Sequence, residues 1–428
     1  MHNHKELLKL IWAKGLYSGQ GLKTVGGAPV EVIDRGTANR NSGTLESLFD
    51  ISGVVVSIGD TQYRGNVAVS SKASDVKDMH PEESAIYDNI ILLVVGDADA
   101  VVCRSDGSVI PTAEIKYPAD IDRKYGQLTN QNTAYGCAPY FARFRKVDKY
   151  AYLTRLTVER LERKHNDFRK LYEESDQNWY EAFYITLFAT MGAGSNKEAY
   201  VRLAGTVPYH LLTRMKDSVE DMEALLLGGS GLLAVQYPDE YTSLLMKRFE
   251  ELRKAFQITP MRYNDWDLSA SKPNHHPVVR IVELASLFAH REFLFAQLME
   301  CKTPRDVGAV FSVEASDYWT THFVPSAKSE YSVKRIGSVM LNILTINLVV
   351  PMIATYGKIY NNDELLDRAI ELLEKSYAER NRYTIGWEAG GIELENAFFT
   401  QGLIQLSREY CEKKRCTECN IGEIFLCS

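Results

Sequence analysis

Three cysteines near the end of the chain have the spacing of metal ligands. Cys411, Cys416 and Cys419 form the pattern C-x4-C-x2-C. Thiolates this close together can surround a zinc ion or ligate an iron–sulfur cluster. Cys427 could supply a fourth ligand locally, but we favour Cys137, because the Cys-Ala-Pro segment there needs an anchor. We expect a site that holds the tail to the body of the protein without catalysing anything. The alternative is a set of reduced thiols.

A basic stretch, Arg143–Lys170, could follow a phosphate backbone. It holds ten Lys and Arg against four Asp and Glu, with aromatic residues between them that could stack on bases. The candidate nucleic-acid contacts lie at its start: Arg143, Arg145, Lys146 and Lys149. The alternative, which we favour, is a helix with a charged outer face and an aromatic inner face. The net charge of −7 also argues against a protein that wraps nucleic acid.

The whole chain has the composition of a folded protein with more than one domain. Its 428 residues are 45% hydrophobic and 25% charged, which predicts two or three domains. The apolar stretch Val339–Ala354 contains Pro351 and is short for a bilayer, so we expect a buried core helix and no membrane partner. The first residues lack the apolar core of a signal peptide, and the seven cysteines are unevenly spaced. We therefore expect a cytoplasmic protein.

The elements that must position these residues change type part-way along the chain. Residues 17–117 hold short β-branched runs separated by Gly, Asp and Ser, which predict a small mixed sheet. Beyond Tyr150, Leu, Tyr and Phe recur three and four residues apart, which predicts helices. The fold class is therefore α+β. We place a mixed-sheet domain at residues 1–140 and a mostly α-helical domain, with the cysteine-rich tail, at 141–428.

Nine segments occur in the order found in a known family. They are PVEVID (Pro29–Asp34), RGNV (Arg64–Val67), YDNIIL with VV (Tyr87–Val95), IPTAEIK (Ile110–Lys116), EALLLGGSGLL (Glu223–Leu233), HPVVRIVELASLF (His276–Phe288), YWTTHF (Tyr318–Phe323), INLVVP (Ile346–Pro351) and the tail Gln401–Gly422. In these segments the chain resembles the uncharacterised bacterial domain-of-unknown-function family 2851. That resemblance implies no established activity.

The N-terminal part of that family is similar to PD-(D/E)xK nucleases, which have a restriction-endonuclease-like fold. There, a β-hairpin presents an acidic residue and then an acidic-x-basic pair. The carboxylates hold Mg²⁺ and the basic group stabilises the transferred phosphoryl. This chain has Gly43–Glu46 where the family reads G-P-D-F. Ala68 and Ser70 replace the carboxylate and imidazole of G-N-V-E-I-H, and Leu93 replaces a further His.

These departures predict a catalytically silent relative of the nucleases with a binding or scaffolding role. Two alternatives remain. A divergent Mg²⁺-dependent nuclease could use Glu46, Lys72 and Glu31, because Lys72 shares a strand face with Ser70 if the strand extends that far. A structural or interaction protein would have no nucleic-acid partner, and these side chains would be ordinary solvated charges.

Overall fold

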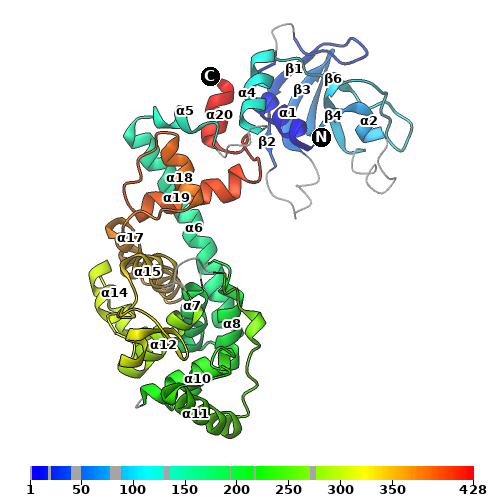
Figure 1. The fold of residues 1–428 in the computed structure, drawn as a ribbon. Coiled ribbons are helices and arrows are strands. Elements are labelled where there is room, and N and C mark those ends of the chain that lie inside the picture. The colour runs from blue at the N-terminus through cyan, green and yellow to red at the C-terminus, as the bar shows by residue number, and fades with distance from the viewer. Residues whose placement is uncertain are drawn as a thin grey trace. The chain divides into compact units, whose positions relative to one another are not determined.

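The computed structural model describes residues 2–17, 21–39, 50–77, 88–129, 135–192, 194–215, 218–269 and 276–428. It combines many helices with one mixed sheet, so the predicted α+β class is confirmed (Figure 1). The chain separates into two compact units. Unit 1 comprises Met1–Arg145, Gly386–Ile392 and Leu406–Ser428. Unit 2 comprises Lys146–Ile385 and Glu393–Gln405.

Unit 1 is built on the mixed sheet that the short β-branched runs predict. Its strands are β1 (Val30–Asp34), β2 (Thr37–Ala38), β3 (Ile51–Ile58), β4 (Thr61–Lys72), β5 (Ile90–Asp97) and β6 (Thr112–Glu114). They lie in the order β1-β3-β4-β5-β6, with β2 paired to β3. The pairs β1–β3 and β3–β4 are antiparallel, whereas β4–β5 and β5–β6 are parallel. The long hairpin β3–β4 therefore occupies the centre of the sheet.

Helices cover both faces of this sheet. Helices α1 (His2–Lys14), α4 (Ala119–Thr129) and α20 (Asn420–Cys427) bury apolar side chains against one face, together with Val67, Val69 and Leu92. The short helix α2 (Ala73–Lys77) covers the other face, where Ala68 and Leu93 are buried. Because side chains alternate along a strand, Val67 and Val69 serve the first core and Ala68 the second. The β4 strand is thus enclosed on both sides.

The tail belongs to unit 1 and not to the helical domain that we expected at 141–428. Leu426 of α20 is 1% exposed and lies in the core under α1 and α4. In Figure 1, α20 lies beside α4. The ring of Phe425 also contacts Tyr140, with centroids 5.3 Å apart. The helical periodicity of the tail could not indicate which core it joins, because only tertiary contact decides that.

Unit 2 consists almost entirely of helices. They are α6 (Lys146–Glu174), α7 (Trp179–Met191), α8 (Lys197–Thr206), α9 (Tyr209–Leu212), α10 (Val219–Ser230), α11 (Glu240–Phe256), α12 (Pro277–His290), α13 (Leu294–Met299), α14 (Pro304–Val310), α15 (Ser338–Leu344), α16 (Val350–Ile359) and α17 (Asp363–Lys375). A short hairpin joins β7 (His322–Val324) to β8 (Ala327–Lys328). Helix α19 (Ala397–Leu406) begins in this unit, α5 (Ala138–Ala142) belongs to unit 1, and α18 (Arg382–Ala389) is divided equally between the two units.

The apolar stretch around Pro351 forms one continuous helix, Ser338–Ile359. It is the single helix in the described residues that is long and apolar enough to cross a membrane, and 61% of its most apolar window is buried inside the protein. A π-helical turn precedes Pro351 and frees the carbonyl of Ile346. Lys164 donates to that carbonyl at 3.1 Å and to the side-chain oxygen of Asn347 at 2.7 Å. The helix is therefore fixed to α6 by polar contacts as well as by burial.

The assignment of the tail to unit 1 predicts a destabilised variant. Leu426→Ala should lower the free energy of unfolding by about 2–4 kcal/mol, because it opens a cavity beneath α1 and α4. Ile424→Ala, on the same helix at a position that is 44% exposed, should change it by less than about 0.5 kcal/mol. Urea unfolding of the full chain measures both. Equal effects of the two substitutions would show that α20 is not part of this core.

Candidate functional site

One largely enclosed carboxylate, that of Asp50, connects α1 to the central hairpin. Asp50 directly precedes β3, and its Oδ2 accepts the backbone N–H of Val69 on β4 at 2.8 Å. Its Oδ1 lies 2.9 Å from Nζ of Lys5 and 3.0 Å from Nζ of Lys9. The two lysines are four residues apart on α1, so they lie on one face of the helix. Asp50 is therefore bound by the sheet and the helix at once.

The charges around Asp50 are matched within this cluster. Burial lowers the pKa of Lys9, but the carboxylates of Asp50 and Glu6 raise it by more, so the pKa stands above its usual value of 10.5. Lys9 also donates to Glu6 at 2.9 Å. The side chain of Asp50 is 11% exposed, which leaves it little contact with water. The ammonium groups thus occupy the place that a cation would take beside a buried carboxylate.

The strand residues on either side of Val69, the backbone partner of Asp50, are two of the positions that the sequence analysis singled out. Ala68 and Ser70 are 4% and 7% exposed. Ala68 pairs with Leu93 on β5, so two of the singled-out positions are direct neighbours. Ala68 and Leu93 both pack in the apolar core beneath α2, on the face of the sheet away from α1. An apolar core therefore surrounds these two positions.

The structure does not bring Glu31 and Lys72 together. Glu31 pairs with Ser57, which pairs with Gln62 near the start of β4. Lys72 is at the far end of the same strand, ten positions on, or about 33 Å at 3.3 Å per residue. Two groups this far apart cannot share one metal ion. The strand register of the sheet, which a motif search does not provide, sets the separation of Glu31 and Lys72.

Lys72 and Glu46 differ in what the structure shows of them. Strand β4 extends to Lys72, which is the condition for Lys72 to share a strand face with Ser70. Nζ of Lys72 lies 3.7 Å from Oδ2 of Asp97. Both side chains are at least half exposed. Glu46 lies outside the residues that the structure describes. Lys72 is therefore a solvated cation with a loosely held partner.

Asp50 is a carboxylate of the hairpin that the sequence analysis did not single out. We named Glu46 as a substitute for the acidic residue in the divergent-nuclease alternative, whereas Asp50 stands at the start of β3 and contacts the strand of Ala68. The signal was present in the sequence, because Asp50 immediately precedes an apolar run, Ile51–Ile58. Lys5 and Lys9, four residues apart in an amphipathic helix, were a second signal.

A family model covers most of this chain. The model, described as "Protein of unknown function (DUF2851)", matches residues 5–382. The chain belongs to the DUF2851 family. No curated protein and no solved structure is significantly similar to it. The match includes Asp50, Ala68 and Ser70 but ends before the cysteines of the tail.

The basic stretch of this DUF2851 protein is largely occupied by internal partners. Arg160 donates to Gln401 and Arg163 to Gln405, both at 2.6 Å. Lys146, one of the four candidate contacts, lies 2.9 Å from Glu395. Of the other three candidate contacts, Arg143 and Arg145 precede α6 and are exposed. The third, Lys149, is partly exposed. The favoured interpretation of an ordinary amphipathic helix agrees with these contacts.

Four cysteines of unit 1 lie close enough to influence one another, and we call them the thiol cluster: Cys137, Cys411, Cys416 and Cys419. Burial raises the pKa of Cys137 to about 12, with contributions from Cys419 and Cys416. Burial, then Cys137, Cys419 and Cys416, hold the pKa of Cys411 well above its usual value. Cys427 is not part of this group, because the charges that act on it are Glu423, Lys14 and Lys124.

The thiol cluster is not assembled as a site for one ion. All seven cysteines of the chain are free. Among the residues that the structure describes, no three His, Cys, Asp or Glu side chains are arranged to hold a metal ion. The structure thus brings Cys137 close enough to the tail thiols to affect their pKa values, without arranging them as a metal site in the described part of the chain.

In unit 2, a buried carboxylate joins two segments that we matched to the family. Glu223 of α10 is fully buried and accepts hydrogen bonds from Tyr241 at 2.9 Å and from Ser316 and Trp319 at 2.8 Å. Burial raises the pKa of Glu223, although these three donors lower it. Because each donor is satisfied, the arrangement fixes α10 to the segment around Trp319 and leaves no free group for chemistry.

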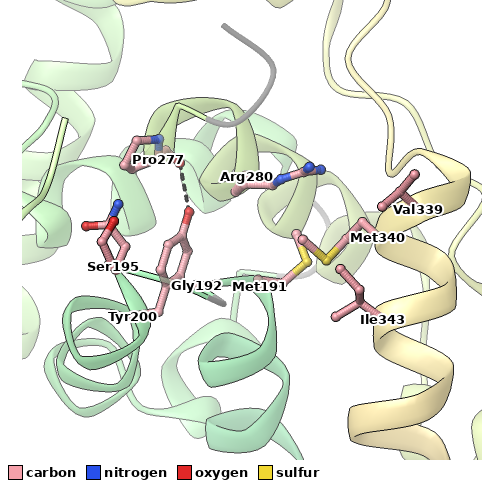
Figure 2. A pocket seen from close by; sticks show the side chains of 11 residues that line it. Met191, Gly192, Ser195, Tyr200, Pro277, Arg280, Val339, Met340 and Ile343 are labelled. Carbon is pink, nitrogen blue, oxygen red and sulfur yellow. Dashed lines mark hydrogen bonds between the residues drawn. The ribbon is translucent and has the colours of Figure 1, made fainter. Parts of the chain in front are cut away.

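A cavity of about 310 Å³ lies between α7, α8, α12 and α15 in unit 2. Figure 2 shows Met191, Met340 and Ile343 on one side of it and Tyr200 on the other, with Arg280 between. Nη1 of Arg280 lies 2.7 Å from the buried Glu283. The cation is therefore already neutralised, and the rest of the wall is mainly apolar. The cavity offers no reactive group.

The Asp50 cluster predicts a graded loss of stability. Asp50→Asn should lower the free energy of unfolding by about 1–2 kcal/mol, because two ammonium groups lose their counter-charge while the Val69 N–H keeps an acceptor. Asp50→Ala should cost about 2–3 kcal/mol, because that N–H is also left unpaired. The contribution of Lys9 should be present below pH 10.5 and decline as the pH rises through its raised folded-state pKa.

Asp97→Asn is the matched control, because Asp97 is an exposed carboxylate with one lysine at 3.7 Å. It should change the free energy of unfolding by less than about 0.5 kcal/mol. Urea unfolding at neutral pH measures all three variants. An Asp50→Asn protein as stable as the wild type would mean that Lys5 and Lys9 do not depend on this carboxylate.

Proposed function

We propose that this DUF2851 protein is related to PD-(D/E)xK nucleases, has lost catalysis and acts by binding. The observation that carries the proposal is the state of Asp50. Its carboxylate is neutralised by Lys5 and Lys9, and its neighbours on β4 are Ala68 and Ser70. A hydrolytic site of this type needs at least two carboxylates around a divalent ion and a basic group beside them. In the described part of the hairpin, lysines already match the charge of Asp50, and Ala68 and Ser70 supply neither a second carboxylate nor a basic group.

The arrangement of the hairpin supports the relation to nucleases. The similarity implies a hairpin that presents an acidic residue and then an acidic-x-basic pair. Asp50 stands before β3 and accepts the Val69 N–H of β4, next to the pair's positions, Ala68 and Ser70, along that strand. The side chain of Ala68 faces the α2 side of the sheet, whereas Asp50 contacts lysines of α1 on the other side. The hairpin of the resemblance is therefore present, but its reactive groups are not assembled on one face.

A divergent nuclease would need other groups to supply the metal site. Glu31 is about 33 Å along the sheet from Lys72, so these two cannot serve one ion. Glu46, the third residue of this alternative, lies outside the residues that the structure describes. The divergent-nuclease alternative therefore depends on Glu46, and the cleavage assay that includes Glu46→Ala tests it.

The purified full chain should not cleave DNA or RNA in Mg²⁺ or Mn²⁺. Without a second carboxylate and a basic group, neither the metal nor the developing charge is held. The measurement is cleavage of labelled duplex and single-stranded substrates by the wild type, Asp50→Asn and Glu46→Ala. Metal-dependent turnover that disappears in either variant would overturn the proposal. Turnover that is equal in all three proteins would identify a contaminating nuclease.

Binding of nucleic acid should be weak and steeply dependent on salt. The exposed cations Arg143 and Arg145 offer phosphate contacts, but several lysines and arginines that follow them are paired within the protein. The measurement is the dissociation constant for a fluorescent duplex across a range of salt concentrations. A logarithmic slope near zero would exclude the electrostatic mode. No binding at low salt would instead support the structural or interaction protein.

A further inference from the structure

Most polar side chains that line the unit 2 cavity are engaged by partners inside the protein. Ser195 hydrogen-bonds to the carboxylate of Asp267. Asn196 donates its amide N–H to the carbonyl of Asp267 and accepts the backbone N–H of the same residue, both at 2.8 Å. Tyr200 donates its hydroxyl to the carbonyl of Pro277 at 3.1 Å, as Figure 2 shows. These three residues of the wall therefore offer little hydrogen bonding to a bound molecule.

Arg280 is different, because part of its guanidinium group is unused. Nη1 donates to Glu283 at 2.7 Å, whereas Nε and Nη2 have no hydrogen-bond partner among the residues that the structure describes. The side chain is 11% exposed, and in Figure 2 it extends from α12 toward Val339 and Met340 of α15. An enclosed N–H group without a partner costs free energy. The cavity thus presents donor groups that an oxygen atom of a ligand would satisfy.

The ion pair of Arg280 and Glu283 decides the charge of the ligand. Glu283 is 3% exposed, so its carboxylate depends on the guanidinium for its counter-charge. The pair is neutral as a unit, and an anionic ligand would bring a further charge that nothing in the pair balances. The oxygen of a ketone, ester or amide accepts from Nε or Nη2 without adding a charge. The pair therefore favours an uncharged molecule with a carbonyl oxygen.

The walls of the cavity suit a small and mainly apolar body. The ring of Tyr200 is fixed, because it packs edge to face on Trp266 with centroids 5.1 Å apart and lies against Gly192 on its other side. Opposite this ring, Met191 and Met340 present flexible thioether side chains, which adapt to the shape of a ligand (Figure 2). The volume of about 310 Å³ is at the lower end of the range for small-molecule sites, about 300–1,000 Å³.

We propose that this cavity binds a small, uncharged and mainly apolar molecule through one carbonyl oxygen, which accepts hydrogen bonds from Arg280. Glu283 is a positioning residue, because it holds the guanidinium through Nη1 and cancels its charge. No bond is made or broken, since the wall carries no reactive group. The site goes beyond the proposed function, which concerns the hairpin of unit 1, whereas the cavity lies in unit 2.

The test is titration of the full chain with Prodan, an uncharged naphthyl ketone whose emission moves to shorter wavelength when it leaves water. We expect saturable binding of about one dye per chain with a shifted emission. 2-Acetonaphthone, an uncharged ketone, should displace the dye. 2-Naphthoate has the same rings with a carboxylate in place of the acetyl group, and it should compete at least about tenfold more weakly because its charge is not balanced.

Two substitutions locate the dye in the cavity. Met340→Trp should fill the space and weaken dye binding at least about tenfold. Ser338→Trp is the matched control, because Ser338 is an exposed residue of the same helix that does not line the cavity. It should bind the dye with the affinity of the wild type.

Glu283→Gln tests the role of the ion pair. The glutamine oxygen still accepts from Nη1 of Arg280, but the pair becomes cationic. The variant should bind 2-naphthoate at least about tenfold more tightly than the wild type does, while its affinity for 2-acetonaphthone changes less than about threefold. A purely structural role of Glu283 would not change the preference between the two competitors.

Four results would overturn the proposal. Absence of saturable dye binding by the wild type would exclude the site. Competition by 2-naphthoate as strong as that by the ketone would show that the wild-type cavity does not select an uncharged ligand. Equal dye binding by Met340→Trp and Ser338→Trp would place the dye elsewhere, and an unchanged preference in Glu283→Gln would exclude the role of the pair. The wild-type titrations decide the first two, even if a variant fails to fold.

Discussion

The arrangement of unit 1 depends on the neutralisation of one carboxylate. Asp50 lies where helix α1 meets the β3–β4 hairpin, and an ionised carboxylate with so little access to water is costly unless it is paired. The Val69 N–H satisfies one oxygen, and the ammonium groups of Lys5 and Lys9 balance the charge. In a metal-dependent nuclease a divalent ion would provide that balance. Here the helix provides it, which fixes α1 to the sheet.

The other departures from the nuclease pattern are consistent with lysine ammonium groups standing in place of a metal ion. With a polar pair on β4, the face beneath α2 would need to stay open to water and metal. With Ala68 there and Leu93 beside it on β5, the same face is a packed apolar core. Restoring one carboxylate would place an unpaired charge in that core. Under the proposed function, the absence of the reactive groups goes together with the apolar packing of this face.

That Ala68 and Ser70 replace reactive groups of a nuclease stays a prediction. The sequence predicted the fold class, because the β-branched runs that form the sheet are a local pattern. It did not predict that Glu31 and Lys72 lie at opposite ends of the sheet, because strand register is a long-range property. Nor did it place the tail in unit 1, since that depends on contacts such as Phe425 with Tyr140. Asp50 was not singled out, because its contacts with Lys5, Lys9 and the Val69 N–H join segments distant in the sequence.

The most direct test of this account is binding of Mn²⁺ to the full chain, measured by titration calorimetry for the wild type and Asp50→Asn. Mn²⁺ prefers the oxygen ligands that a nuclease carboxylate would supply. If Lys5 and Lys9 already neutralise Asp50, the wild type should show no saturable binding that the substitution removes. Saturable binding of one Mn²⁺ per chain that is lost in Asp50→Asn would show that the carboxylate still holds a metal, and would contradict the account.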